Sequence, residues 1–374
     1  MPLIPQVFPE NLYFTVTIDG VSFPYTTQAR LTHKTNMSRT FTCSFVGKEA
    51  LEMCRIGAVV EVNWGRGNLT NLIDDSNFIG FIKSINPSEK GSFIAFDYTT
   101  LLAKSQYTYY KAEDYIGQDL YFAAASACDI DDGRNSWASR IIDVSRLISG
   151  SGIFITKDMN LFGWKTRKEF IDACFNEMKV LVDDDRHPTN TIRQWQYAIR
   201  TGNVMDFFLP DADNTITHPD ITLSIDNNNI IDEKIISYID TSRLINAITV
   251  VSKDDETISA QLEDKGSQEK YGVISYFLLY PSLDKNELED VAYKILNQYK
   301  DPSIIYSVSL TNSDNLDLGD VVKIDMPSLP STTVKSVIEY DITFGETING
   351  RYKIGVPQVN ISEYIDRLKA PTDR

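Results

Sequence analysis

The chain has 374 residues, of which 42% are apolar and 11% aromatic, and its net charge is −16. A single hydrophobic core stops growing at about 250–300 residues, so this length predicts several domains. The negative charge argues against a dedicated nucleic-acid-binding protein, because affinity for phosphates depends on Lys and Arg. We expect DNA to be at most in transit past this protein.

The chain carries no sequence signal for a membrane or for secretion. No run of about 18 apolar residues occurs, and residues 1–5 lack the basic flank and apolar core of a signal peptide. We therefore expect no membrane insertion by this chain and a start in the cytoplasm. Cys43, Cys54, Cys128 and Cys174 stand singly without CxxC spacing, which predicts four buried thiols and no disulfide.

Short β-rich segments fill the first hundred residues. The first two, at 12–18 and 21–25, flank Asp19-Gly20, a dipeptide that favours a hairpin turn. Clusters of Asn, Gly, Pro and Ser separate the further segments, at residues 39–46, 58–64, 78–85 and 92–98. This spacing is typical of a small antiparallel β-barrel, which we place at residues 1–106.

Helical periodicity enters after residue 107. The clearest helix begins at the capping box Thr166-Arg167-Lys168-Glu169, and its apolar face contains Phe170, Ile171, Cys174, Phe175 and Met178. Weaker helical patterns cover residues 118–128 and 137–148. An alternating pattern at Trp195, Tyr197 and Ile199 indicates a strand before a turn at 201–203 and a second strand through Phe208. We predict an inserted α+β domain over residues 107–215.

β-rich segments return after residue 216. They lie at residues 221–225, 234–240, 247–252, 257–262, 272–279, 304–310, 320–324, 333–344 and 351–354. One amphipathic helix interrupts them at residues 284–300, with the apolar positions Leu288, Val291, Ala292, Ile295 and Tyr299. We predict a second β-barrel domain over residues 216–358 that contains this helix. A charged C-terminal tail follows over residues 359–374, with a short helix at 362–369.

Two sequence words occur in both β-rich regions and in the same order. Gly57-Ala58-Val59-Val60-Glu61-Val62 recurs as Gly319-Asp320-Val321-Val322-Lys323-Ile324, and Ile82-Lys83-Ser84-Ile85 recurs as Val334-Lys335-Ser336-Val337. A glycine at a tight turn, followed by alternating apolar residues, suits one wall of a barrel. The words favour a duplication, and the alternative is two unrelated β-domains. The predicted fold class is mainly β, with two related small antiparallel β-barrels plus the inserted α+β domain.

Three passages carry a resemblance to a known family. They are residues 77–85 followed by 93–98; residues 262–272, with an Asp-x-x-Ser…Tyr-Gly pattern; and the helix at 287–299 followed by Leu316-Asp317-Leu318-Gly319-Asp320-Val321-Val322. Their order resembles the baseplate hub proteins of contractile-tailed phages, prophage-derived particles and related injection systems, including the late-control protein D and VgrG relatives. The resemblance spans most of the chain and implies the tail-hub fold.

In that family the two barrels of one subunit are related, so three subunits form a ring of six similar barrels. The resemblance implies a homotrimer in the virion baseplate that joins a hexameric tail tube to a trimeric central spike and leaves an axial channel. The implied partners are the tail tube protein, the central spike protein and other baseplate proteins. VgrG relatives carry the spike in the same chain. Here only residues 359–374 follow the second barrel, so we expect a separate spike polypeptide.

No residue pattern indicates a catalytic, cofactor-binding or metal site. The acidic clusters at Asp129, Asp131 and Asp132 and at Asp183-Asp184-Asp185 lack EF-hand spacing and lie where solvated turns are expected. His33, His187 and His218 form no HExxH motif and have no cysteine at ligand spacing. Gly65-Arg66-Gly67 and Gly150-Ser151-Gly152 lack the context of a phosphate-binding loop. We therefore predict no enzyme and no cofactor.

Two alternatives to a hub stay open. A receptor- or carbohydrate-binding tail protein would expose the aromatic run Tyr107-Thr108-Tyr109-Tyr110, which we instead expect in a core or a subunit interface. A cell-wall hydrolase would need an acid and a base that converge in a cleft.

Overall fold

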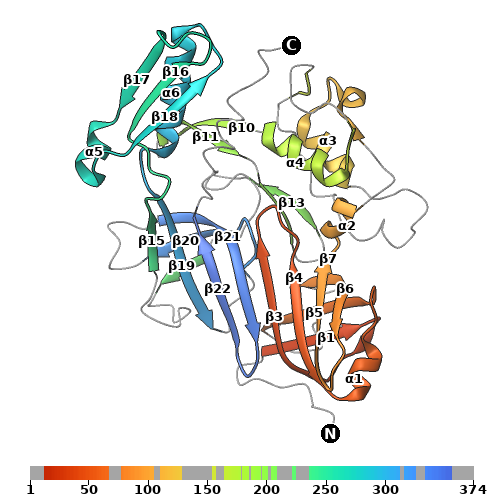
Figure 1. Ribbon diagram of the computed structural model, residues 1–374. Helices are drawn as coiled ribbons and strands as arrows, with labels where there is room; N and C mark the ends of the chain where they lie inside the picture. The colour runs from red at the N-terminus through yellow and green to blue at the C-terminus, as the bar shows by residue number, and fades with distance from the viewer. Residues whose placement is uncertain are drawn as a thin grey trace.

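The computed structural model is shown in Figure 1. It describes residues 12–66, 77–104, 110–128, 154–156, 164–177, 179–184, 187–194, 196–200, 204–208, 221–224, 236–311, 316–325 and 333–355.

The elements follow one another in three groups along the chain. The first group is β1 (Leu12–Ile18), β2 (Val21–Ser22), β3 (Thr26–Lys34), β4 (Thr40–Val46), α1 (Lys48–Met53), β5 (Val59–Arg66), β6 (Phe78–Asn86) and β7 (Lys90–Asp97). The second is α2 (Thr99–Lys104), β8 (Tyr110–Lys111), a 3-10 helix (Ala112–Tyr115), α3 (Leu120–Cys128), β9 (Trp164–Lys165), α4 (Arg167–Glu177), β10 (Lys179–Asp184), β11 (His187–Gln194), β12 (Gln196–Ile199) and β13 (Met205–Phe208). The third is β14 (Ile221–Ser224), β15 (Ile236–Asp240), β16 (Ala247–Ser252), β17 (Ser259–Glu263), α5 (Lys265–Tyr271), β18 (Ser275–Tyr280), α6 (Lys285–Tyr299), β19 (Ser303–Thr311), β20 (Val321–Asp325), β21 (Thr333–Phe344) and β22 (Ile348–Ile354).

The protein is mainly β, and one 13-stranded sheet dominates it. The order of paired strands is β15-β19-β22-β21-β3-β4-β7-β6-β5-β1-β2, and β20 and β14 continue from β21. The pairing is antiparallel except between β14 and β20. The sheet therefore joins strands from both ends of the chain, and they lie side by side in Figure 1.

Apart from β2, the sheet consists of two halves with the same strand order. The first half-sheet runs β3-β4-β7-β6-β5-β1, and the second runs β15-β19-β22-β21-β20-β14. In each half, the last two strands along the chain form an antiparallel hairpin. These hairpins are β6 with β7 and β21 with β22. The halves differ at their ends, because β1 pairs with β5 antiparallel whereas β14 pairs with β20 parallel.

The repeated glycines occupy equivalent positions in the two half-sheets. Gly57 and Gly319 have φ values of +85° and +83°, a conformation that favours glycine. The Gly57 N–H donates to the Ile82 carbonyl at 2.8 Å, and the Ile82 N–H donates to the Ala58 carbonyl at 2.9 Å. Gly319, Val337 and Asp320 repeat this pair of bonds, both at 2.9 Å. The first repeated word therefore marks the same turn in both halves.

The register of the second repeated word is wrong by three residues. The bonds of the two glycines make Ile82 equivalent to Val337, whereas the words aligned Ile82 with Val334. A β-bulge follows at the equivalent place in each half, between Ile82 and Ser84 and between Val337 and Glu339. The two words match in residue type alone, and the backbone bonds show that they occupy different positions in the two strands. The closed barrels stay a prediction, since the described strands form open paths.

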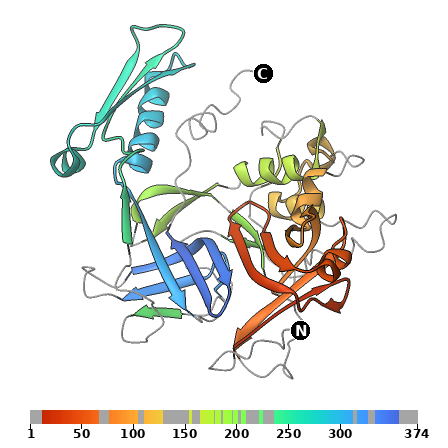
Figure 2. The same cartoon turned by 60° about the horizontal axis from the view of Figure 1, so that its bottom comes forward.

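The chain segment that connects β15 to β19 forms a separate lobe. The segments that the sequence analysis placed in the second barrel at 247–252, 257–262 and 272–279 pair instead in their own sheet, in the order β17-β16-β18. Helix α6 covers one face of this sheet, and the two share a core. Figure 2 shows the lobe projecting away from the half-sheets.

The Asp-x-x-Ser…Tyr-Gly passage builds helix α5 of this lobe. The Asp264 carboxylate accepts from the Ser267 N–H at 2.9 Å and so caps the helix, and Gly272 ends it with φ +79°. The Ser267 hydroxyl donates to the Lys300 carbonyl at the end of α6. The passage therefore has a structural role: it caps α5 and attaches it to the end of α6.

Two of the helices predicted for the middle region fall within the described residues, and both are present as α3 and α4. The helix predicted at 118–128 is α3, and the capping box is confirmed by two bonds, Thr166 N–H to the Glu169 carboxylate at 2.8 Å and Glu169 N–H to the Thr166 hydroxyl at 3.3 Å. The predicted apolar positions Phe170, Ile171, Cys174 and Phe175 of α4 are buried, and the fifth, Met178, lies outside the described residues. The predicted helices at 137–148 and 362–369 lie outside the described residues.

Candidate functional site

Of the residues weighed as catalytic or metal-binding candidates, Asp184 and His187 lie opposite each other in the β10–β11 pair, and the described ranges bring no third candidate from another element beside them. His33 is in β3, His187 is in β11, Asp183 and Asp184 end β10, and Gly65 and Arg66 end β5. The remaining candidates lie outside the described residues: Gly67, Tyr107 to Tyr109, Asp129, Asp131, Asp132, Gly150 to Gly152, Asp185 and His218. Tyr110 begins β8. Among the described residues, no three side chains of His, Cys, Asp or Glu are grouped as a metal site would need.

The four cysteines are buried and free, as the sequence predicts. Burial raises the pKa of Cys43 to about 12, that of Cys54 to about 11 and that of Cys174 to about 12. A thiol with a raised pKa is a poor nucleophile at neutral pH. Within the described ranges, no helix is long and apolar enough to cross a membrane.

The feature that organises the molecule is the junction between the two half-sheets, where β3 pairs with β21. The antiparallel register runs from Glu339 opposite Lys34 to Phe344 opposite Ala29. One further backbone bond extends it, from the Thr35 N–H to the Ile338 carbonyl at 3.2 Å. This pairing converts two half-sheets into one continuous sheet.

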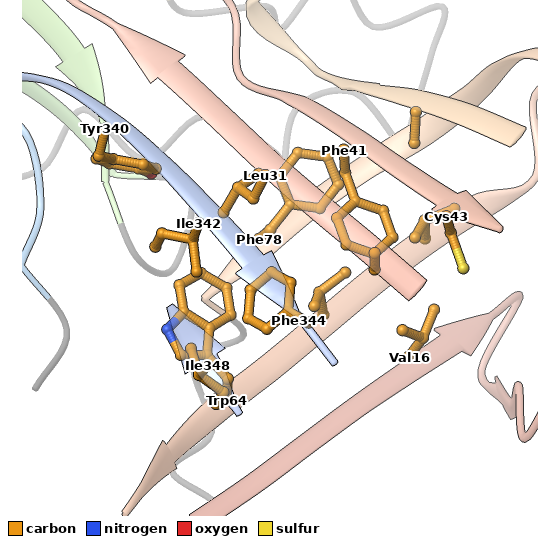
Figure 3. Close-up of a cluster of buried hydrophobic side chains, with 14 of the residues drawn as sticks. Val16, Leu31, Phe41, Cys43, Trp64, Phe78, Tyr340, Ile342, Phe344 and Ile348 are labelled. Atoms are coloured by element: carbon orange, nitrogen blue, oxygen red, sulfur yellow. The ribbon is translucent and has the colours of Figure 1, made fainter. Parts of the chain in front are cut away.

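A single hydrophobic core spans the junction. Phe344 of β21 stacks on Phe14 of β1 with ring centroids 4.4 Å apart, and Trp64 of β5 meets the same ring edge-on at 5.3 Å. Leu31 and Ile342, which are opposite each other in the register, are both fully buried. Figure 3 shows Leu31 and Trp64 of the first half-sheet in one cluster with Ile342 and Phe344 of the second. The halves are therefore packed as one body.

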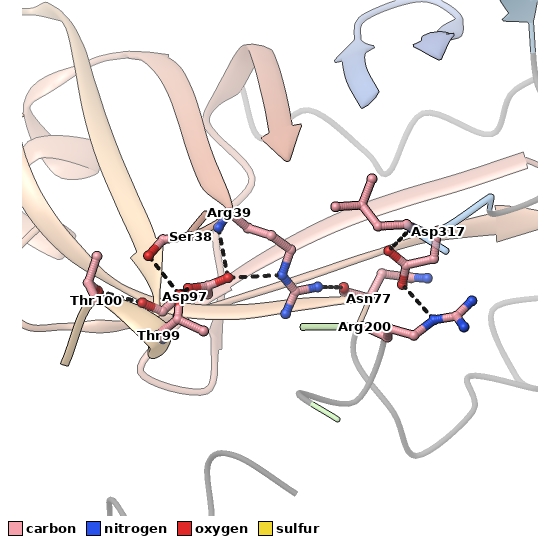
Figure 4. Close-up of polar contacts among 9 residues, drawn as sticks. Ser38, Arg39, Asn77, Asp97, Thr99, Thr100, Arg200 and Asp317 are labelled. Atoms are coloured by element: carbon pink, nitrogen blue, oxygen red, sulfur yellow. Dashed lines mark hydrogen bonds and ion pairs between the residues drawn. The ribbon is translucent and has the colours of Figure 1, made fainter. Parts of the chain in front are cut away.

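A buried ion pair fixes the end of the first half-sheet near the junction. Arg39 and Asp97 are both fully buried, with Nε 3.3 Å from Oδ2, and the Arg39 backbone N–H donates to the same oxygen at 2.8 Å. The guanidinium also donates to the Asn77 carbonyl at 2.7 Å, and the Thr99 N–H donates to Asp97 at 3.1 Å. Figure 4 shows this network. Burial raises the pKa of Asp97, and the Arg39 charge opposes that effect.

His33 lies beside this network without a hydrogen bond to either ring nitrogen. It is 2% exposed, and its ring meets Tyr340 of β21 edge-on at 5.4 Å. Burial, followed by the positive charge of Arg39, holds the pKa of His33 well below its usual range. His33 is therefore neutral in the junction, where its ring packs against Tyr340.

The β12–β13 hairpin ties both half-sheets to the middle region. The Asn36 N–H donates to the Tyr197 carbonyl at 3.0 Å, and the Tyr197 N–H donates to the Asn36 side chain at 2.9 Å. Next to this contact, Arg200 forms ion pairs with Asp206 at 3.0 Å and with Asp317 and Asp320 beside Gly319. Figure 4 shows Arg200 reaching Asp317. The β12–β13 hairpin therefore connects the two half-sheets, because it contacts the first at Asn36 and the second through Arg200.

Sequence reasoning missed β3, the strand on which the junction depends. Its buried positions are Ala29, Leu31 and His33, and the less buried positions between them, Arg30 and Thr32, are polar. Two apolar residues give too weak an alternation to mark a strand. His33 is the third buried residue of the strand. Its burial depends on the tertiary structure and could not be predicted from the sequence pattern.

By sequence, no protein-family model and no curated protein matches the chain. By structure, it is similar to the tail protein from Neisseria meningitidis MC58 (10% identity, TM-score 0.53, 94% of this chain and 99% of that chain covered). It is also similar to the 43 kDa tail protein of prophage MuSo2 from Shewanella oneidensis (11%, TM-score 0.56, 93% and 99%). A third likeness is to a chain of the lidded PdpA–VgrG complex of Francisella (12%, TM-score 0.51, 94% and 53%). The chain therefore shares its fold with these tail proteins and with a chain of the PdpA–VgrG complex, and the resemblance found in the sequence is confirmed at the level of fold.

Proposed function

We propose that this chain is a structural subunit of a phage-type tail baseplate, a hub that forms a homotrimeric ring. The ring binds the hexameric tail tube on one side and the trimeric central spike on the other, and it leaves an axial channel. Each subunit contributes two related barrels, so that the ring presents six similar units to the tube. The hub resides in the virion tail and contacts other baseplate proteins.

The main observation in support of this proposal is that the two half-sheets have the same strand order. A trimer of an unduplicated chain offers three equivalent surfaces, and these match a three-fold spike but not a six-fold tube. A duplicated chain offers six related surfaces, and the equivalent turns at Gly57 and Gly319 indicate that the halves are related. The fold that the chain shares with tail proteins supports the same assignment.

The work proposed for this chain is mechanical, and no reaction is assigned to it. A subunit with this role must be rigid. The continuous core across the junction and the ion pairs of Arg200 hold the two half-sheets in one fixed arrangement. The charge of −16 suits a channel wall that DNA passes without being retained.

The test is the mass of the purified chain in solution, together with negative-stain imaging, alone and with its cognate tail tube protein. We expect a species of three chains, each of 42.3 kDa, that appears as an annulus and caps the tube. A chain that stays monomeric and forms no annulus even with the tube protein would contradict the proposal. Release of reducing sugar from purified cell wall would favour the hydrolase alternative instead.

A further inference from the structure

The junction inside the chain defines a geometry that two other strands are placed to repeat. At the junction, β21 receives β3 on the side that β20 leaves free, because β20 pairs only with Thr333 to Ser336. The equivalences set by Gly57 and Gly319 map β21 onto β6 and β3 onto β15. The counterpart of the β3·β21 pair is therefore β15 beside β6.

Both of these edges are open in the described part of the chain. β15 ends the 13-stranded sheet and pairs on one side, with β19. On β6, the pairing with β5 covers Phe78 to Phe81, whereas Ser84 to Asn86 pair with β7 alone. Ser84 and Asn86 are exposed. Figure 1 places β15 on the left and β6 on the right of the half-sheets, and the two do not pair with each other within the described chain.

We propose that β15 of one copy pairs antiparallel with the outer edge of β6 in the next copy. The inference rests on the proposed ring and specifies its contact between subunits. The internal junction dictates the register, in which Asp240 lies opposite Ser84, Ile239 opposite Ile85 and Tyr238 opposite Asn86. These pairs correspond to Lys34 with Glu339, His33 with Tyr340 and Thr32 with Asp341.

One backbone bond of the junction predicts its counterpart between copies. The Thr35 N–H donates to the Ile338 carbonyl, and the equivalent residues are Thr241 and Lys83. The Thr241 N–H therefore donates to the Lys83 carbonyl of the next copy. Because Thr35 and Ile338 form a hydrogen-bonded pair, the next pair along, Lys34 with Glu339, is non-hydrogen-bonded. Asp240 with Ser84 inherits that closer spacing.

A second copy of this chain is the partner that fits. Each copy has one β15 edge and one β6 edge, so the contact is head-to-tail and can close into a ring. An exposed strand edge left unpaired is a liability, and pairing within a ring removes it. One copy supplies β15, the counterpart of the strand β3 that already satisfies this geometry within the chain.

The contact between copies is weaker than the junction inside the chain. At the junction, the Arg30 Nε–H donates to the Asp341 carboxylate at 2.7 Å, and Phe344 fills the core. The residues equivalent to that ion pair are Ile236 and Asn86, which cannot form one. In addition, β6 ends at Asn86, whereas β21 continues to Phe344. We therefore expect a ring whose formation depends on protein concentration and increases with the tube protein present.

Disulfide trapping in the full chain tests the register. Non-hydrogen-bonded pairs in antiparallel sheets have Cα atoms about 4.5 Å apart, within the range that a disulfide spans. We expect chains carrying Ser84→Cys, mixed with chains carrying Asp240→Cys, to give a covalent dimer of one of each under mild oxidation. Neither variant alone should cross-link, and a chain with both cysteines should give covalently linked trimers. The four native cysteines are buried and do not compete.

The matched control is Ser84→Cys mixed with Ile239→Cys, because a shift of one residue turns the side chain to the other face of the sheet. We expect a several-fold smaller cross-linked fraction from the control. Asn86→Cys with Tyr238→Cys is a second in-register pair, for use if a variant of the first pair does not fold. Rings seen by imaging that cross-link no better than the control would overturn the inference and leave the hub intact. Chains that stay monomeric with the tube protein would overturn the hub itself.

Discussion

Phe14 and Phe344 stack with ring centroids 4.4 Å apart, although they lie near opposite ends of the described chain. Phe14 belongs to the first half-sheet and Phe344 to the second, so this contact joins the two halves through their cores as well as through the β3·β21 backbone bonds. The junction is therefore a packed hydrophobic interface, and its stability depends on a few large side chains.

Replacing Phe344 with alanine should destabilise the junction strongly. Phe344 is 1% exposed and contacts both Phe14 and Trp64, so truncation removes apolar burial and leaves a cavity. We expect a loss of about 3–5 kcal/mol in the free energy of unfolding, measured by urea denaturation. The control is Phe277→Ala in β18, where the ring is 60% exposed and the change should stay within about 0.5 kcal/mol. Equal losses at both positions would contradict the assignment of Phe344 to the core.

The two equivalent glycines should respond differently to alanine. At both positions the positive φ costs an alanine about 1–2 kcal/mol. A Cβ at Gly57 would meet no atom within 4 Å, whereas a Cβ at Gly319 would lie 2.9 Å from the Phe208 ring. We expect Gly319→Ala to lower the thermal midpoint more than Gly57→Ala does, as measured by differential scanning fluorimetry. The opposite order would show that the Phe208 ring does not pack against the Gly319 turn.

Removing the Arg39 charge should cost far more than removing an exposed arginine. Arg39→Met leaves Asp97 buried without its guanidinium partner, which costs about 3–5 kcal/mol. Arg55→Met breaks the ion pair with Asp19 at the surface, where the Arg55 side chain is 73% exposed, and should cost about 1 kcal/mol or less. Chemical denaturation measures both. The double variant Arg39→Met with Asp97→Asn should recover part of the loss, because no buried charge is then left unpaired.

His33 should make the fold sensitive to acid. Its pKa in the folded protein is well below the ordinary value of 6.5, because burial and the charge of Arg39 disfavour the imidazolium. The unfolded chain therefore binds the proton more readily, and the stabilisation present above pH 6.5 is lost as the pH falls below it. His33→Phe keeps a ring against Tyr340 and should flatten the fall in unfolding free energy between pH 6.5 and about 5.

The difference between wild type and His33→Phe isolates this effect from the carboxylates. The pKa values of Asp97 and Asp317 are raised by burial, so their contribution has the opposite sign and is lost as the pH rises. Arg39 and Arg200, the charged groups that act on His33, keep their charge throughout this range. Identical pH profiles for the two proteins would contradict the prediction.

Local features of the fold could be predicted because they depend on a few neighbouring residues. Asp19 and Gly20 both have positive φ values, as the hairpin turn at that dipeptide requires. The capping box at Thr166 and Glu169 forms as expected, and the apolar stripe of α6 is buried in the lobe. In each case the residues that determine the structure lie within a few positions of one another.

The sequence alone therefore determined the mainly β class, the capped helices, the buried cysteines and the glycine turn that recurs in both β-rich regions. Tertiary structure decided the rest. Strand β3 is defined by its partners β4 and β21, since Ala29 and Leu31 are too few to mark it. The register of the second repeat is set by the backbone hydrogen bonds of Gly57 and Gly319. These bonds cannot be predicted from the side chains of the two strands. Pairing between distant strands leaves no local pattern, because any alternating segment can pair with any other until the core selects one.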